Sequence, residues 1–400
     1  MIRKLLHILW VIIASVLLLL AMAVIGTSVS PIYDFPEPEA FSGPDIFNPY
    51  AAMDTTVGWK RANFHTHTRV KGPFPPNECE AWPKETYDTY MKLGYDIVTF
   101  SNHNEITTHF DPSLQVNVYE QGYSPFKFHK LVFGSSRVIH FDPLLPFMAS
   151  QKQFELNYLG AGSDFIQVNH PYRTVGLTRR QLELLTGYEI MELDTSISTE
   201  NEYWDWALSA GHYSFGLAND DLHHATNPNL IGIRCNFVCT HSGRYEDLKA
   251  ALLSGCYYAM RVPNYGNGDW AEKIEGNAHL PYIESIGLSG NTLYMTLSQK
   301  ADSIRVNGYG HSTLALVEDS SNIYYTMTAA DPYVRMTAFF PGGEVIYTNP
   351  FARYDASEGI FDDPAPTVKW PLTILYNLGL LILIGLCLWA FVKLFARRRR

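Results

Sequence analysis

A unit of helix, glycine and short apolar strand recurs along the middle of the chain and limits the folds open to it. In residues 84–100 a helical pattern ends at Gly94 and a strand pattern follows. The same order recurs at 178–193, 201–217 and 245–260. Such repeats are typical of a parallel sheet covered by helices. We therefore expect an α/β barrel, closed or nearly closed, whose functional residues lie at the carboxyl ends of its strands.

Two apolar runs at the ends of the chain predict membrane helices. Residues 5–26 and 371–392 are nearly unbroken apolar stretches, and a helix of that length spans roughly 33 Å, enough to cross a hydrocarbon core of about 30 Å. Basic residues flank the outer end of each run, namely Arg3, Lys4, Lys393 and Arg397 to Arg400. Because positive charge stays on the cytoplasmic side, we expect a two-pass protein of the lipid bilayer with both termini in the cytoplasm. The alternative for the first run is a cleaved signal peptide, since Ala21-Met22-Ala23 resembles a cleavage site.

The region between the two runs is acidic, which bears on its partners. The chain has 30 Lys and Arg against 40 Asp and Glu, and seven of its basic residues flank the apolar runs. A domain of this charge has no basic face for a nucleic acid, so we exclude that partner. The same charge suits a soluble domain that binds cations.

Changes of pattern along the chain predict the domain boundaries. Residues 27–55 are rich in Pro, Glu and Phe and lack an apolar period, which favours an extended linker. The helix and strand repeats place the barrel within 56–280. Residues 281–355 alternate β-branched and aromatic residues with Gly, Asn and Asp breaks, which predicts a small antiparallel, sandwich-like β domain.

Five short signals of histidine and carboxylate follow apolar runs that favour strands. They are His65-Thr66-His67, Ser101-Asn102-His103-Asn104, His140, Asn169-His170-Pro171 and Asp221-Leu222-His223. Imidazole nitrogen and carboxylate oxygen are ligands that Zn²⁺ and Mn²⁺ prefer. Strand ends that face one pocket would bring these distant residues together, so the pattern predicts a metal site.

A single histidine at a strand end is more often a structural residue than a metal ligand, so closely spaced pairs are the stronger evidence for a metal site. Residues i and i+2 of a strand project to one face, so His65 and His67 can meet one ion. Asp221 and His223 repeat this spacing with a carboxylate. The remaining histidines we interpret as ordinary residues, with His224 a neighbour of the site; they are His109, His129, His212, His241, His279 and His311.

The order of these signals resembles the PHP superfamily, named for polymerase and histidinol phosphatase domains. The resemblance covers about residues 59–260 and rests on four motifs, which are 64–68, 94–104, 169–171 and 216–223. It implies a distorted (β/α)7 barrel, a cluster of two or three Zn, Mn or Fe ions, and hydrolysis of phosphoesters. The end of the chain before the second apolar run looks like the branch of the family with a C-terminal β domain.

The chain also departs from the family's pattern. The bridging glutamate that the resemblance implies would fall within 132–137, where the chain has Gly134-Ser135-Ser136. Asn102 stands where the family's second motif has an aspartate. After the first motif, Glu78 or Glu80 would have to supply the next acidic ligand. Three further acids are open candidates, namely Glu105, Asp142 and Glu192. We therefore expect one to three divalent ions.

These observations predict a membrane-anchored, extracytoplasmic metal-dependent hydrolase that acts on small-molecule phosphoesters through a metal-activated water. His65, His67, His170 and Asp221 would hold the ions that carry the nucleophile. His103, His140 and His223 would complete the cluster, and Arg173 would bind a phosphate oxygen. The alternative is a degenerate domain of the same kind that binds a ligand or partner without turnover, which the serines at the bridging position favour.

Overall fold

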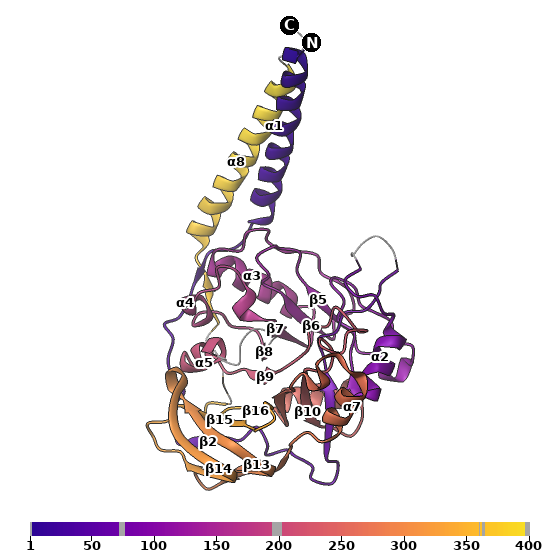
Figure 1. The fold of residues 1–400 in the computed structure, drawn as a ribbon. Helices are drawn as coiled ribbons and strands as arrows, with labels where there is room; N and C mark the ends of the chain where they lie inside the picture. The colour runs from indigo at the N-terminus through magenta and orange to yellow at the C-terminus, as the bar shows by residue number, and fades with distance from the viewer. Residues whose placement is uncertain (1, 72–76, 194–201, 360, 362–364, 397–400) are drawn as a thin grey trace.

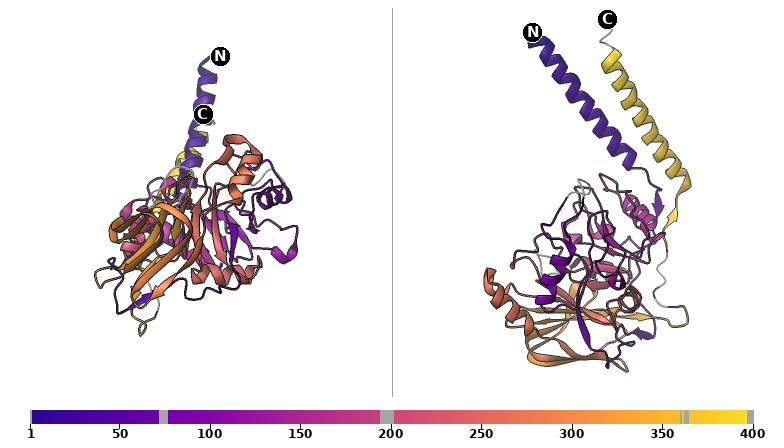
Figure 2. Two further views of the ribbon diagram at one scale, coloured as in Figure 1. Left: turned by 60° about the horizontal axis from the view of Figure 1, so that its bottom comes forward. Right: turned by 90° about the vertical axis from the view of Figure 1, so that its right-hand side faces the viewer.

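The computed structural model describes residues 2–71, 77–193, 202–359, 361 and 365–396. Two long helices, α1 (Ile2–Thr27) and α8 (Trp370–Ala396), leave the same side of an α/β body (Figures 1 and 2). Both helices are long and apolar enough to cross a membrane, and almost none of their residues are buried within the protein. This finding concerns length and composition alone.

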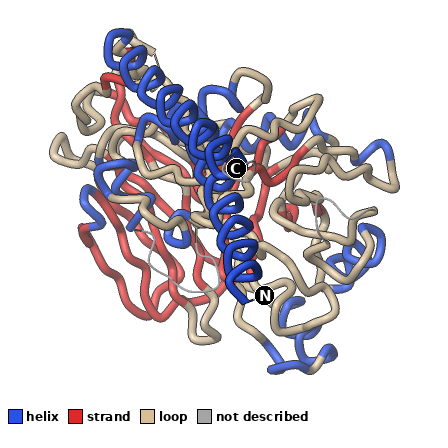
Figure 3. Tube along the Cα trace, turned by 90° about the horizontal axis from the view of Figure 1, so that it is seen from above, coloured by secondary structure: helices blue, strands red, loops and turns tan. Residues whose placement is uncertain are grey.

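Helix α1 ends and helix α8 begins at the same point of the body. The short strands β1 (Tyr33–Asp34) and β18 (Thr367–Val368) pair antiparallel just below them. The Ile32 amide donates to Thr373 Oγ1 at 2.8 Å, and the Lys369 amide donates to the Ile32 carbonyl at 2.8 Å. Seen from above, the helices therefore lie together across the body (Figure 3).

A five-stranded sheet forms one wall of the body, in the order β5-β6-β7-β8-β9. Its strands are β5 (Val118–Gln121), β6 (Lys130–Phe133), β7 (Phe165–Val168), β8 (Ile190–Glu192) and β9 (Phe215–Leu217). The pairs β7–β8 and β8–β9 are parallel, whereas β5–β6 and β6–β7 are antiparallel. The helices α3 (Ala149–Gly160), α4 (Arg179–Leu182) and α5 (Glu202–Ser209) lie between its strands in the chain.

An eleven-stranded sheet forms the second wall, with the path β12-β13-β15-β16-β11-β10-β3-β4. Its members nearest the first sheet are β3 (Trp59–Asn63), β4 (Ile97–Val98), β10 (Arg234–Cys239) and β11 (Tyr257–Arg261). Only β3 and β4 pair parallel among these four, because β10 is antiparallel to both β3 and β11. The expected parallel sheet is therefore correct only for part of the structure.

The two walls meet at two isolated bridges instead of continuous ladders, so the expected α/β barrel is not closed by continuous strand pairing. Thr66 pairs with Leu222 at one seam, and His103 pairs with Glu120 at the other. Strand pairing fails to continue at both seams because the chain bends there: Asn104 and Asp221 have positive φ angles of 52° and 49°. The body is a mixed α/β structure whose two sheets face each other across these seams.

The later strands continue the second wall. They are β12 (Ile283–Ser289), β13 (Thr292–Gly308), β14 (Ser312–Thr326), β15 (Tyr333–Phe339), β16 (Val345–Thr348) and β17 (Phe351–Tyr354). All of them pair antiparallel, as expected, and β16 hydrogen-bonds to β11. A domain boundary near residue 281 stays a prediction. The segment 27–55, expected as a linker, holds β1 and β2 (Asp45–Phe47), and β2 pairs with β17.

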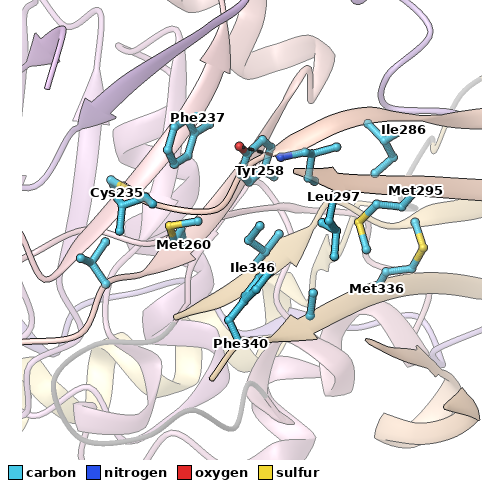
Figure 4. Packing of buried hydrophobic residues seen from close by; sticks show 14 of the residues in the cluster. Cys235, Phe237, Tyr258, Met260, Ile286, Met295, Leu297, Met336, Phe340 and Ile346 are labelled. Carbon is cyan, nitrogen blue, oxygen red and sulfur yellow. Dashed lines mark hydrogen bonds between the residues drawn. The ribbon is translucent and has the colours of Figure 1, made fainter. Parts of the chain in front are cut away.

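One apolar core runs beneath β10, β11 and the later strands (Figure 4). Phe237, Tyr258 and Met260 pack there with Met295 and Ile346, and all five are buried. The Tyr258 hydroxyl accepts a hydrogen bond from the Ile283 amide at 3.2 Å, which ties β11 to β12. This continuous core holds β10, and through it β3, in the position from which the site residues project.

The helices that the glycine pattern predicts are confirmed: α2 (Pro83–Lys92), α5 and α6 (Tyr245–Ser254). Gly255 ends α6 in the left-handed conformation with a φ of 79°, and its amide bonds to the Ala251 carbonyl. A Cβ at this position would lie 2.2 Å from Phe215 Cε1. The glycine is therefore required both by the backbone turn and by the close approach of β9.

We predict that Gly255→Ala lowers the free energy of unfolding by about 2–4 kcal/mol, from backbone strain and overpacking against Phe215. The matched control is Gly290→Ala, because Gly290 also has a positive φ of 57° but has nothing within 4 Å of an added Cβ. The control should lose only about 1 kcal/mol. Chemical denaturation in detergent measures both, and equal losses would contradict the packing role.

Candidate metal centre

His65 and His67 lie just beyond the end of β3 and form the floor of a buried polar centre. The amide of His67 donates to the Leu222 carbonyl at 3.0 Å, which fixes this segment at the first seam. The two rings are 5.3 Å apart between centroids, and both side chains are fully buried. As the i, i+2 spacing predicts, both imidazoles point into one space.

The turn after β9 brings a carboxylate to the same space. Asp220 accepts hydrogen bonds from the amides of Gly232, Ile233 and Arg234, and this locks the turn. Asp221 follows, and its Oδ1 lies 3.3 Å from Nε2 of both His65 and His67. The Asp221 side chain is 8% exposed.

Glu120, at the second seam, is the carboxylate that the sequence reading missed. Its Oε2 lies 3.2, 3.1 and 3.0 Å from Nε2 of His65, His67 and His103. Its Oε1 lies 3.1 Å from His129 Nδ1 and 3.2 Å from His170 Nε2. A carboxylate therefore does lie among the histidines, but it comes from β5, one strand before the segment 132–137 in which the resemblance implied it, while Ser136 is exposed on the turn after β6.

Two histidines exchange the roles expected of them. His129 was interpreted as ordinary, yet it joins His103 and Glu120 in a group spaced to hold a metal ion. Gly122 makes room for it, because a Cβ there would lie 2.3 Å from the His129 ring. His140 is exposed in the loop after β6, with Nδ1 3.0 Å from the Tyr123 hydroxyl, and belongs to none of the metal-type groups found in the described part of the chain. The structure therefore does not bring His140 together with the other predicted ligands.

The described residues contain three overlapping groups that are spaced to hold metal ions. They are His65, His67, Glu120 and Asp221; His67, Glu78 and His103; and His103, Glu120 and His129. In each group the donor atoms lie within 4.8 Å of one another. Glu78 rather than Glu80 supplies the acid of the second group, since Glu80 accepts hydrogen bonds from Thr226.

His170 and His223 lie at the edge of these groups. His170 follows β7 with a φ of 28°, and its Nε2 is 3.2 Å from Glu120 Oε1. His223 is 34% exposed, and its Nε2 lies 3.7 Å from Glu78 Oε2. Of the seven predicted ligands the structure thus brings together His65, His67, His103, His170, Asp221 and His223.

A second layer of polar side chains orients the first. Glu192 Oε1 lies 2.9 Å from His65 Nδ1, and Glu192 Oε2 accepts the amide of His170 at 2.9 Å. A carboxylate in this position holds the His65 proton on Nδ1 and leaves Nε2 free toward the cluster. Asp142 does not reach the centre, because it caps the amides of Tyr123 and Ser124.

Asn102 and Arg173 support neighbouring segments. Asn102 accepts the amide of Thr68 at 2.7 Å and donates to the hydroxyls of Thr68 and Thr107, so it fastens the first two motifs together. Arg173, on the short turn after His170, forms an ion pair with the Asp221 carboxylate and is 28% exposed. Its role as a phosphate ligand stays a prediction.

The donor atoms of the centre fit divalent ions. Four of these atoms are buried and lack hydrogen bonds, namely His65 Nε2, His67 Nε2, Glu78 Oε2 and Glu120 Oε2. They lie close together all the same: Glu120 Oε2 is 3.2 and 3.1 Å from Nε2 of His65 and His67, and Glu78 Oε2 is 3.5 Å from His67 Nδ1. A buried polar atom without a partner costs about 1–3 kcal/mol. Several such atoms aimed at one space, all imidazole nitrogen or carboxylate oxygen, match the ligand preference of Zn²⁺ and Mn²⁺.

The charges of the metal-free centre follow from burial and mutual contact. Burial opposes ionisation of Glu120, but His103, His65 and His129 outweigh it and hold the pKa of its carboxyl well below the usual range. Burial likewise opposes ionisation of Asp221, yet His65 and His67 keep its pKa well below the usual range. Burial lowers the pKa of His103 to about 3, so that ring is neutral near pH 7 and able to bind a cation.

Comparison with known proteins adds a distant likeness. No family model and no curated protein sequence matches the chain. A two-domain protein from Bacteroides vulgatus, described as containing a predicted PHP-like metal-dependent phosphoesterase, aligns over 79% of this chain and 100% of its own at 14% identity and a TM-score of 0.39. The lesion-specific endonuclease PfuEndoQ from Pyrococcus furiosus aligns over 49% of this chain and 56% of its own at 13% identity and a TM-score of 0.33.

We predict that the metal-free protein loses stability as the pH rises from 6.5 to 9. Burial alone would lower the pKa of His67, but the carboxylates of Asp221 and Glu120 raise it to about 9 from 6.5. A histidine whose pKa rises on folding stabilises fully below 6.5, and this contribution, up to about 3 kcal/mol, is lost as the pH passes 9. The melting temperature of the EDTA-treated protein in detergent measures the effect.

His67→Asn should reduce this pH dependence, and the exposed His279→Asn should leave it unchanged. Added Zn²⁺ or Mn²⁺ should raise the melting temperature more at pH 8.5 than at pH 6.5, because the ion competes with the proton on His67. An equal slope in His67→Asn and in the unsubstituted protein would contradict this assignment of charge.

Proposed function

We propose that the chain is a metal-dependent hydrolase of phosphoesters, anchored in a membrane by α1 and α8. One observation carries the proposal. The buried carboxylate of Glu120 lies within 3.2 Å of ring nitrogens from five histidines, which are His65, His67, His103, His129 and His170. A carboxylate shared by so many imidazoles is the ligand arrangement expected of a cluster of divalent ions.

The three overlapping ligand groups assign residues to one, two or three ions. His65, His67 and Asp221 would hold the first ion together with one oxygen of Glu120. His103 and His129 would share Glu120 with it to hold a second, and Glu78 would join His67 and His103 at a third. When bound, such ions acidify a water molecule and neutralise the charge that develops on a phosphoryl group.

The residues around the cluster have their own proposed tasks. Glu192 holds His65 in the tautomer that presents Nε2. Arg173 holds the Asp221 carboxylate and, being partly exposed, presents the remaining guanidinium N–H groups to phosphate oxygens. His223 hydrogen-bonds through Nδ1 to the Asp221 carbonyl at 2.8 Å, which leaves Nε2 of this partly exposed ring to exchange a proton with a leaving group.

A groove beside the cluster gives room for the rest of a substrate. It measures about 690 Å³ and is lined by residues that include Glu78, His223, His224 and Asn227. The polar side chains on its lining, among them those of Glu78, His223 and Asn227, can contact a small polar phosphoester. The basic residues toward the two ends of the chain, Arg3, Lys4, Lys393 and Arg397 to Arg400, support an orientation with both termini in the cytoplasm and the cluster outside it.

The alternative, a degenerate domain that binds without turnover, was motivated by Gly134-Ser135-Ser136. Glu120 weakens this alternative, because its carboxylate, which comes from β5, lies between the histidines. The hydrolase is therefore the function that the geometry supports best.

We predict that the full-length protein purified in detergent binds Zn²⁺ or Mn²⁺ and hydrolyses members of a phosphoester panel only when metal is present. Glu120→Gln should weaken metal binding by more than about 100-fold and abolish hydrolysis, because it removes the shared charge. The exposed Glu246→Gln and the exposed Ser136→Glu should leave metal content and hydrolysis within about twofold of the unsubstituted protein.

Elemental analysis and a colorimetric phosphate assay measure these outcomes. A protein that stays folded, binds no divalent ion and hydrolyses nothing would contradict the proposal. A rise of activity in Ser136→Glu would instead favour the degenerate domain.

A further inference from the structure

The chain just after Arg173, at the edge of the metal centre, is hydrogen-bonded to a neighbouring loop. Arg173 contacts Asp221, and the next two residues hydrogen-bond across to the loop between β5 and β6. Thr174 Oγ1 donates to the Lys127 carbonyl at 2.8 Å, and the Val175 amide donates to the Phe126 carbonyl at 2.8 Å. That loop joins Glu120 to His129, so it forms the wall of the cluster on this side.

The same loop is connected to the end of α1. Ser124 Oγ donates to the Leu144 carbonyl at 3.0 Å, and the Leu144 amide donates to Thr27 Oγ1, in the last residue of α1, at 3.2 Å. Helix α3 lies below α1 in the same part of the body (Figure 1). A short hydrogen-bonded path therefore links the edge of the cluster to the end of the apolar helix.

Apolar side chains are exposed along this path. Phe147 is 53% exposed and Val175 is 54% exposed. Phe126 is partly exposed, and its ring packs edge-on against Phe147 at 4.9 Å between centroids. The exposed Lys127 stands beside them. We call Phe126, Lys127, Phe147 and Val175 the ledge.

We propose that the ledge rests on the lipid bilayer beside α1, with its three apolar side chains among the lipid head groups and Lys127 on anionic lipid phosphates. Aromatic side chains with a neighbouring cation are typical of protein segments that lie at a membrane surface. We choose the bilayer as the partner of the ledge because the ledge lies close to the end of α1, the helix proposed to enter the membrane. The last residue of that helix, Thr27, accepts a hydrogen bond from the Leu144 amide.

The proposal rests on the membrane anchoring of the proposed function and deepens it. A ledge held at the bilayer puts Arg173 and the cluster next to the head groups. The substrate class is then a phosphoester carried by a lipid, whose polar part extends toward the groove at Glu78 and His223.

The test places the photo-crosslinking residue p-benzoylphenylalanine at single positions of the full-length protein in nanodiscs of phosphatidylcholine and phosphatidylglycerol. Replacement of Phe147 and of Val175 tests the ledge. Replacement of Leu381 in α8 is the positive control. Replacement of Tyr324, which is 69% exposed on β14 at the end of the body remote from α1 and α8 (Figure 1), is the matched negative control.

After irradiation, mass spectrometry should find lipid adducts at 147 and 175 at least tenfold above the level at 324. Lipid adducts at 381 but none at 147 or at 175 would overturn the ledge and leave the proposed function standing. Absence of adducts at 381 would overturn the membrane anchoring and the ledge together. The metal content of the same variants reports on the hydrolase separately, because none of these positions belongs to the cluster.

Discussion

The carboxylate of Glu120 is the point on which the rest of the centre depends. Five imidazole rings from four segments of the chain lie within 3.2 Å of its two oxygens, and it is 1% exposed. A buried anion in such a place needs compensation. In the metal-free protein the protonated rings of His65 and His67, whose pKa values the neighbouring carboxylates raise, supply it, and bound divalent ions would do so in their place.

The position of this carboxylate explains the shape of the fold around it. Its backbone pairs with His103 at one seam between the two sheets, and the other seam joins Thr66 to Leu222. Both seams carry ligand residues, so the cluster lies where continuous strand pairing stops. Ions bound there would join the two sheets through side chains at the places where backbone pairing is limited to single bridges, which couples metal binding to the stability of the body.

Local sequence signals predicted the parts of this structure that depend on local chemistry. Gly94 and Gly255 end helices as expected, and the i, i+2 spacing of His65 and His67 places both rings in one space. The signals did not reveal how strands pair over long range, so the antiparallel β10 and the open seams were missed. His129 and His140 were exchanged because neighbouring residues in the sequence do not show which ring faces Glu120; in the structure His129 Nδ1 lies 3.1 Å from Glu120 Oε1, and His140 is exposed. Glu120 had a signal in the sequence, a single carboxylate just after the β-favouring residues Val116, Val118 and Tyr119, but it lies outside the segment 132–137 to which the resemblance pointed.

The most direct measurement is a crystal structure of the protein grown with Mn²⁺, with anomalous diffraction data collected to locate the ions. The account predicts at least one anomalous peak about 2.0–2.3 Å from Glu120 Oε2 and from Nε2 of His65 and His67. Manganese bound elsewhere with the Glu120 site empty at saturating metal, or Glu120 turned away from the histidines, would contradict it.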